Sequence, residues 1–297
     1  KGLIKNYYAY KIYVKLNNVN EFKAGTYIFK RNYDTKKIVD ILKSGDYNKE
    51  GIKITFNEGK NVRDIAKIIE ENSSITKDEF YNVLSDQSYI DSLINKYWFL
   101  TDDIKNKDIY YPLEGYLYAD TYIFSNNMTV KEVIEAMLNQ TDKIFTKYKN
   151  KFDNSNYNVH EIVTLASIIE SEGIYDDDRK NIAGVFYNRL NSNMPLGSDI
   201  TTYYAFKVDL SERDLTIKEL NTYNPYNTRG PNMEGKLPVG AVSNFGESSL
   251  LAALEPAKND YYYFVADKQG KTHFTKTYSE HEGIIRKLKQ EGNWIEW

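Results

Sequence analysis

Apolar residues recur at every third or fourth position along several stretches of the chain, and each such stretch predicts a helix. The clearest case is residues 159–173, where Ile162, Leu165, Ala166 and Ile169 form one apolar stripe. The glycine at the end of this stretch predicts a stop in the left-handed conformation. We therefore expect an amphipathic helix here that packs one face against the core.

Two glutamates lie in the last turn of this expected helix. Glu170 shares a face with Ala166 and Ser167 and borders the apolar stripe, whereas Glu172 lies on another side, near Ile168. A carboxyl group at an apolar edge keeps its proton more easily than a solvated one, as a general acid requires. The alternative is that both glutamates are exposed side chains at a helix end, and helix position alone does not decide between the two.

The N-terminal pattern predicts two strand–turn–helix units in succession. Together they indicate a small α+β module, and the alternative is that they form an edge of the main domain. The first unit comprises a strand at residues 12–16, a turn and strand at 23–29 and a helix at 35–45, which Asp34 or Thr35 caps. The second unit comprises a strand at 52–56 and a helix at 62–72.

The remainder predicts a larger mixed α+β domain. A polar, weakly periodic stretch at residues 98–111 is the expected boundary, so we expect an N-terminal module with its linker at 1–105 and a second domain at 106–297. Helices are expected at 76–84, 129–145, 176–190, 249–254 and 279–288, strands at 261–266 and 273–275, and loops at 194–202 and 223–246. Thr76 and Glu79 have the spacing of a capping box at the start of the first of these helices.

Composition narrows the possible functions. The 39 basic and 42 acidic residues leave a formal charge of −3, which argues against nucleic acid as a partner. Cysteine is absent, so thiol catalysis, disulfides and thiolate metal sites are excluded. The three histidines do not have the spacing of a zinc site. No apolar run reaches the roughly 20 residues that cross a bilayer.

Other candidate motifs are weaker. Asp199, in the loop at 194–202, is the nearest downstream candidate for a second polar group in the active site. Gly230, Gly235 and Lys236 have the spacing of a phosphate loop, but Leu237 stands where that motif requires Ser or Thr. The acidic run at 176–178 suits a helix N-terminus better than a metal site.

Several stretches, in order, resemble the YceG-like family of endolytic murein transglycosylases. Any one of them could be chance, but their order along most of the chain makes the resemblance specific. They are A-G-T-Y (24–27), F-N-E-G (56–59), L-E-G-Y-L-Y-A-D-T-Y (113–122), L-A-S-I-I-E-S-E (165–172), L-P-V-G-A-V-S-N (237–244), L-E-P-A-K-N-D-Y-Y-Y-F-V-A-D (254–267) and H-F-T-K-T-Y-S-E-H (273–281).

The resemblance implies a membrane-anchored, extracytoplasmic enzyme with a LysM-like N-terminal module and a YceG-like catalytic domain. Such an enzyme cuts the MurNAc–GlcNAc β-1,4 bond of peptidoglycan and leaves 1,6-anhydro-MurNAc ends. The cleavage is expected to terminate nascent strands and to need no metal or organic cofactor. The resemblance also implies an anchor upstream of this chain and a penicillin-binding protein synthase as partner. Glu170 takes the place of the catalytic acid. The implied substrate-binding residues are Glu114, Asp120, Ser167, Asp199, Thr201, Tyr226 and Asn227.

The chain departs from the family pattern at four positions. Gly197 stands where the family has Gln, Ile200 and Ala119 stand where it has Pro, and Glu255 stands where it has Asn. The lost Gln side chain removes an expected substrate hydrogen bond. Two alternatives therefore stay open: a noncatalytic glycan-binding scaffold for a cell-wall synthase, and a hydrolysing muramidase with Asp199 as the partner of Glu170.

Overall fold

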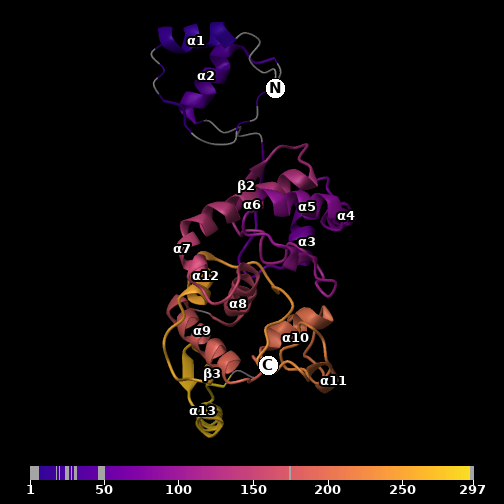
Figure 1. The fold of residues 1–297 in the computed structure, drawn as a ribbon, viewed down its shortest axis with the longest axis vertical. Helices are drawn as coiled ribbons and strands as arrows, with labels where there is room; N and C mark the ends of the chain where they lie inside the picture. The colour runs from indigo at the N-terminus through magenta and orange to yellow at the C-terminus, as the bar shows by residue number, and fades with distance from the viewer. Residues whose placement is uncertain are drawn as a thin grey trace. The chain divides into compact units, whose positions relative to one another are not determined.

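The chain folds as an α+β protein, as its sequence predicts (Figure 1). The computed structural model describes residues 7–17, 19, 21–23, 27, 29, 32–45, 51–173 and 175–294. In these residues helices dominate, and the strands form two sheets of two strands each. The chain divides into two compact units: unit 1 comprises residues 1–54 and 123–128, and unit 2 comprises residues 55–122 and 129–297.

Unit 1 contains helices α1 (Tyr7–Leu16) and α2 (Thr35–Ser44). The strand expected at residues 12–16 is wrong, because these residues belong to α1. Tyr10, Tyr13 and Val14 share a partly buried helical face, whereas the alternating Ile12 and Leu16 are exposed. A short alternation of apolar residues therefore misled the strand prediction.

Helix α2 confirms the prediction for residues 35–45. Asp34 caps its start by accepting a hydrogen bond from the backbone of Lys37, and Gly45 ends it in the left-handed conformation, with φ of 66°. The turn and strand expected at 23–29 fall mostly outside the described residues. Lys23 and Tyr27 within that stretch belong to neither a helix nor a strand.

Strands β1 (Ile52–Thr55) and β2 (Thr121–Phe124) pair with each other. Helices make up most of the first part of unit 2, and capping side chains mark where several of them begin. Thr76 and Thr129 each form a reciprocal capping box with the residue three positions on, as the sequence predicts for Thr76. The elements are α3 (Val62–Asn72), α4 (Lys77–Leu84), α5 (Gln87–Lys96), the 3-10 helix η1 (Asp102–Lys105), α6 (Val130–Lys147) and α7 (Lys149–Asp153).

The stretch at residues 98–111 buries more apolar side chains than its polar composition indicates. Phe99, Leu100 and Ile104 are buried in it, and residues 55–105 group with unit 2. The domain boundary at residue 105 and the LysM-like character of the N-terminal part stay predictions.

The core of unit 2 is built around α8 (Val159–Glu172), which packs against α9 (Asp176–Asn191) and α12 (Glu247–Leu254) (Figure 1). Every residue from Ile162 to Ile169 is buried. The expectation of a one-sided amphipathic helix is therefore wrong, because neighbours surround α8 and its polar residues bond within the protein. Ser167 and Thr164, for example, bond to backbone carbonyls one turn earlier.

The rest of unit 2 contains short helices, a hairpin and a long loop. The loop expected at 194–202 is shorter than predicted, because α10 begins at Asp199. Residues 223–246 contain neither a helix nor a strand, as expected. The remaining elements are α10 (Asp199–Phe206), α11 (Ile217–Leu220), antiparallel strands β3 (Tyr263–Ala266) and β4 (Thr272–Thr275), and α13 (Tyr278–Gln290), which packs on that hairpin.

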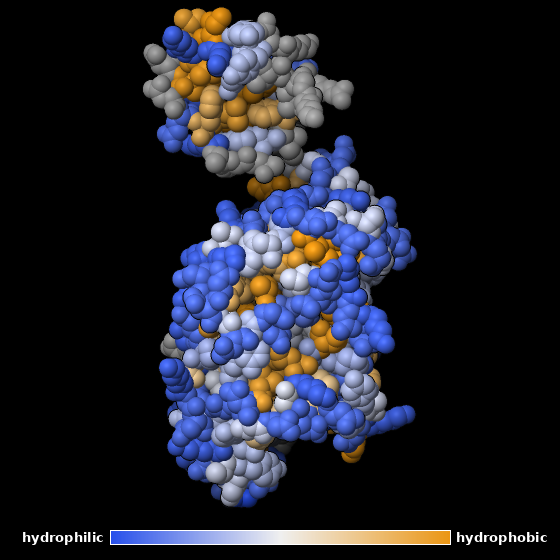
Figure 2. Space-filling view, viewed as in Figure 1, coloured by the Kyte–Doolittle hydropathy of each residue, from blue (hydrophilic) through white to orange (hydrophobic). Residues whose placement is uncertain are grey.

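Figure 2 shows that hydrophilic residues cover much of the visible face of unit 2, with a band of hydrophobic residues running between them. Among the described residues, no helix combines the length and the apolar character that a bilayer crossing requires.

Candidate active site

Helix α8 carries Glu170 in its last turn. The helix begins at a capping box in which Asn158 accepts from the backbone of Glu161 and the Glu161 side chain accepts from the backbone of Asn158. Burial along its middle then fixes the helix against its neighbours. Glu170 follows directly after the buried run, and its side chain is only 6% exposed.

Three donors hold the Glu170 carboxyl group. One oxygen, Oε1, accepts from Arg179 Nη2 at 2.9 Å, and the other, Oε2, accepts from the backbone N of Gly246 at 3.0 Å and from Ser249 Oγ at 2.7 Å. These donors fix the orientation of the carboxyl group. The alternative that the glutamates of the last turn are simply exposed is therefore wrong for Glu170.

Two of the three donors come from the start of α12. Gly246 is the N-cap of this helix, so its free backbone N–H and the positive end of the helix dipole both meet the Glu170 carboxylate. Ser249 adds a hydroxyl group that donates to a carboxylate and, after rotating, accepts from a carboxylic acid. The site thus has one partner that suits both protonation states of Glu170.

The third donor, Arg179, comes from α9 and is 11% exposed. It also pairs with Asp176 at 2.6 Å. Gly173, expected to be left-handed, instead has φ of −96°. A Cβ on this glycine would lie 2.6 Å from Arg179 Cγ, so the glycine leaves room for the arginine rather than providing a special backbone conformation.

A surface pocket of about 420 Å³ borders this cluster. Its lining residues are Asp176, Lys180, Ser248 and Leu251, of which Asp176 pairs with the arginine that holds Glu170. The volume lies in the range of small-ligand sites. Glu170 is therefore enclosed by donors and is linked to this surface pocket through Arg179 and Asp176.

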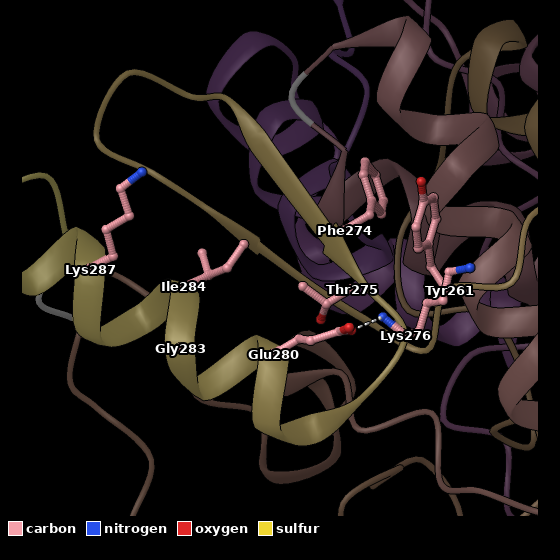
Figure 3. A pocket seen from close by; sticks show the side chains of 8 residues that line it. All are labelled: Tyr261, Phe274, Thr275, Lys276, Glu280, Gly283, Ile284 and Lys287. Atoms are coloured by element: carbon pink, nitrogen blue, oxygen red, sulfur yellow. Dashed lines mark hydrogen bonds between the residues drawn. The ribbon is translucent and has the colours of Figure 1, made fainter.

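A second pocket, of about 470 Å³, lies between the β3–β4 hairpin and α13 (Figure 3). Tyr261 and Phe274 stack on one side of it, and the Glu280 carboxylate accepts from the backbone of Lys276. Among the described contacts, none joins a residue of this pocket to Glu170. We therefore place the candidate site at the first pocket.

Glu172 is held separately from Glu170. Its carboxyl group accepts from Ser198 Oγ at 2.6 Å. Burial raises the pKa of Glu172, and the negative charge of Asp199 adds to the rise, while Ser198, Arg229 and Arg189 oppose it. The two glutamates of the last turn thus point into different surroundings, as their positions on the helix predict.

Glu114, an expected substrate-binding residue, is buried inside the fold. Its two oxygens accept from the backbone N of Val62 at 3.1 and 3.0 Å, and Oε2 also accepts from Tyr204 Oη at 2.9 Å. Burial raises the pKa of Glu114 to about 8, against the lowering effect of these donors. In the structure Glu114 thus fastens the start of α3 to α10.

The following glycine packs closely against α8 and the loop at 223–246. Gly115 has φ of 84°, and a Cβ there would lie 2.5 Å from Ala241 Cβ and 2.8 Å from Val163 Cγ1. The L-E-G-Y sequence therefore combines a buried acid with a residue that only glycine suits.

The other expected substrate-binding residues fall into two groups. Four are fully buried and form hydrogen bonds within the protein, so a direct substrate contact would require these bonds to break. Ser167 accepts from Val242 N, Thr201 donates to the carbonyl of Ser198, and Tyr226 Oη accepts from Tyr110 N. Asn227 accepts from Thr202 and donates to the carbonyls of Glu219, Leu220 and Thr222.

Two are exposed. Asp199 forms an ion pair with Arg229, and Asp120 accepts from Gln140 Nε2 at 3.1 Å. None of the six forms a described contact with Glu170, and their roles in binding stay predictions. At Gly197 the backbone is left-handed, with φ of 63°, so glycine fits there where a glutamine would be strained.

The sequence did not identify the residues that surround Glu170. Arg179, Gly246 and Ser249 lie 9, 76 and 79 positions from it along the chain. One signal was present: a glycine followed by Glu and two serines opens a short helix, and such a helix start binds anions. Among the described residues, no group of three or more His, Asp or Glu side chains is placed to hold a metal ion.

The chain is similar in sequence to known proteins. The model of the YceG-like family matches residues 1–287. The endolytic murein transglycosylase of Bacillus subtilis strain 168 is 37% identical over 281 residues, which cover 94% of this chain and 76% of that protein. The endolytic murein transglycosylase of Streptococcus pneumoniae strain D39 is 32% identical over 298 residues, which cover 95% of this chain but only 53% of that protein.

A solved structure is similar as well. The 2.6 Å crystal structure of a protein named as yceG-like, from Listeria monocytogenes, aligns with a TM-score of 0.74 and 37% sequence identity. The alignment covers 95% of this chain and 91% of that one.

Proposed function

The chain belongs to the YceG-like family, and from this membership we propose that it is an endolytic lytic transglycosylase of peptidoglycan. In this proposal it cuts the MurNAc–GlcNAc β-1,4 bond within glycan strands and leaves 1,6-anhydro-MurNAc ends. The names of the relatives support the reaction and the substrate class, and the resemblance in the motifs supports the product. Glu170 carries the chemistry.

The observation that carries the proposal is the setting of Glu170. The carboxyl group is almost fully enclosed, is oriented by three donors and is linked through Arg179 and Asp176 to a pocket at the surface. An oriented carboxyl group of this kind is what a general acid and base requires. A two-carboxylate hydrolysis through Asp199 has no such support, because Asp199 is paired with Arg229 and faces solvent.

The proposed reaction uses Glu170 twice. In the first step the protonated carboxyl group donates its proton to the glycosidic oxygen, and the bond from that oxygen to C1 breaks. In the second step the Glu170 carboxylate removes the proton from the C6 hydroxyl group of MurNAc, whose oxygen bonds to C1. Because the C6 hydroxyl group belongs to the same sugar, the attack is intramolecular and needs no water.

The partners of Glu170 match these two steps. Ser249 can accept from the acid form and donate to the carboxylate form, while Arg179 and the Gly246 N–H stabilise the carboxylate that the first step leaves. The site therefore has stabilising groups for the intermediate state, where negative charge on Glu170 faces positive charge on the sugar.

The same family membership supports a proposal about location. We propose that the chain lies on the extracytoplasmic side of the cell membrane, is attached through an N-terminal anchor and works beside a penicillin-binding protein synthase. Protease accessibility in intact spheroplasts tests the location, because a chain on the outer face is cut without membrane lysis.

Product analysis tests the function. Peptide-free glycan strands are incubated with the protein, and the new ends are identified by mass spectrometry. We expect internal cleavage and anhydro-MurNAc ends, and no product from a folded Glu170→Gln variant. Reducing MurNAc ends would make the protein a hydrolysing muramidase, and binding to strands without any product would make it a scaffold.

A further inference from the structure

Glu58 belongs to the turn between β1 and α3, and this turn is fixed against the segment that precedes α12. The backbone N of Gly59 donates to the carbonyl of Asn244 at 2.8 Å, and Asn244 N donates to the carbonyl of Lys60 at 2.8 Å. The Asn244 side chain also donates to the carbonyl of Lys60, at 3.0 Å. These bonds hold the F-N-E-G turn beside the residues that contact Glu170.

The Glu58 carboxyl group fills the space that Gly246 leaves by having no side chain. A Cβ on Gly246 would lie 1.9 Å from Glu58 Oε1 and 2.7 Å from Oε2. The backbone of Gly246, with φ of −87° and ψ of 172°, is open to any residue, so the glycine is not required by its conformation. Since the N–H of the same residue donates to Glu170, both carboxyl groups border Gly246.

Glu58 differs from Glu170 in its partners. Within the described part of the chain, the Glu58 carboxyl group forms no hydrogen bond and no ion pair, whereas Glu170 has three donors. Glu58 is also an exposed residue. A carboxyl group that is carried by a fixed turn but unpaired within the described part of the protein is available to a bound molecule.

The surrounding charges favour a positively charged occupant. Partial burial raises the pKa of Glu58, the negative charge of Glu170 adds to the rise, Arg179 opposes it and Asp176 adds again. The Tyr118 side chain also interacts electrostatically with Glu58. Three carboxyl groups thus meet one guanidinium group, and positive charge that develops beside Glu58 would be stabilised there.

We propose that Glu58 is a second catalytic residue of this site, which faces the bound sugar and stabilises the positive charge that develops at C1 as the glycosidic bond breaks. This inference rests on the proposed function. The role is electrostatic: Glu58 forms no bond to the sugar and transfers no proton, so the product remains an anhydro end. A carboxylate in this role must be ionised when the bond breaks.

The test compares Glu58→Gln with wild type and with Glu71→Gln, the same change at an exposed position of α3. The rate of anhydro-end formation is measured on peptide-free glycan strands at several concentrations and pH values. We expect Glu58→Gln to lower kcat about 100-fold with little change in KM. The loss of wild-type activity on the acidic side, caused by protonation of Glu58, should be absent in this variant. Glu71→Gln should behave like wild type.

A second comparison tests whether Gly246 and Glu58 act together. Gly246→Ala keeps the backbone N–H but displaces the Glu58 carboxyl group, so we expect it to lower kcat in the wild-type background. The three atoms nearest to the added Cβ all belong to the Glu58 carboxyl group, so in the Glu58→Ala background Gly246→Ala should cause no further loss. Thermal unfolding confirms that each variant is folded.

The outcomes separate the two proposals. If wild type forms no anhydro ends, the proposed function is wrong. If wild type forms them and Glu58→Gln keeps the wild-type kcat or its acidic limb, the role of Glu58 is wrong. Additive losses from Gly246→Ala and Glu58→Ala would also overturn it, because the two changes would then act independently.

Discussion

Glu114→Gln should change how stability depends on pH. Glu114 is 3% exposed, and its pKa is raised from an ordinary value of 4.5 to about 8. Between these values the folded protein holds a proton that the unfolded chain has released. The free energy of unfolding therefore falls as pH rises from 4.5 to 8, and the stabilisation is fully present only below 4.5. At about 1.4 kcal/mol per pH unit, the effect is roughly 5 kcal/mol.

The glutamine variant does not titrate, so it isolates this effect. Both Glu114 oxygens accept from Val62 N, so the NH₂ group of the glutamine must face this backbone donor, which costs about 1–3 kcal/mol at every pH. We expect the variant to be less stable than wild type near pH 4.5 and equally or more stable near pH 8.5.

Urea unfolding of both proteins across this pH range measures the difference. Glu71→Gln, an exposed change, is the control and should follow wild type. A difference between Glu114→Gln and wild type that stays constant with pH would refute the reasoning, because Glu114 would then be ionised throughout, held by its donors.

Three further changes probe the surroundings of the site. Arg179→Met leaves the enclosed Glu170 without its cation and should lower the free energy of unfolding by about 3–5 kcal/mol. Calorimetry should show a fall in Tm of roughly 6–20 °C. Arg179→Lys should show a smaller fall, and equal Tm values for the two variants would contradict this. Ser249→Ala removes a 2.7 Å hydrogen bond to Glu170 and should lower kcat about 10-fold with KM unchanged, as measured by steady-state kinetics. A change in KM alone would mean that Ser249 binds substrate instead. Gly115→Ala forces a left-handed alanine against Ala241 and should destabilise unit 2 by at least about 2 kcal/mol in urea unfolding, and a smaller loss would mean that the loop yields.

Local features of the chain were predictable because their causes lie within a few residues. The capping box at Thr76, the Asp34 cap of α2 and the helix that carries Glu170 each follow from residues three or four positions apart. Local pattern also failed where it was short: the alternation at residues 12–16 indicated a strand, but the partly buried face of α1 has helical spacing.

The surroundings of Glu170 were not predictable in the same way, because they depend on contacts between distant segments. The start of α12 meets Glu170 across more than 70 residues, and the Glu58 turn meets Gly246 across a greater separation still. Gly173 shows the limit for single residues. Its position predicted a left-handed stop, whereas its lack of a side chain serves the close approach of Arg179.

The origin of the oxygen at the newly formed ends tests the use of one carboxyl group in two steps most directly. Glycan strands are cleaved in ¹⁸O-labelled water, and the new MurNAc ends are weighed by mass spectrometry. Ring closure by the C6 hydroxyl group predicts ends that are lighter than free MurNAc by one water and carry no ¹⁸O, with no ends formed by Glu170→Gln. Ends that carry ¹⁸O would show that water attacks C1, and the account of Glu170 would be wrong.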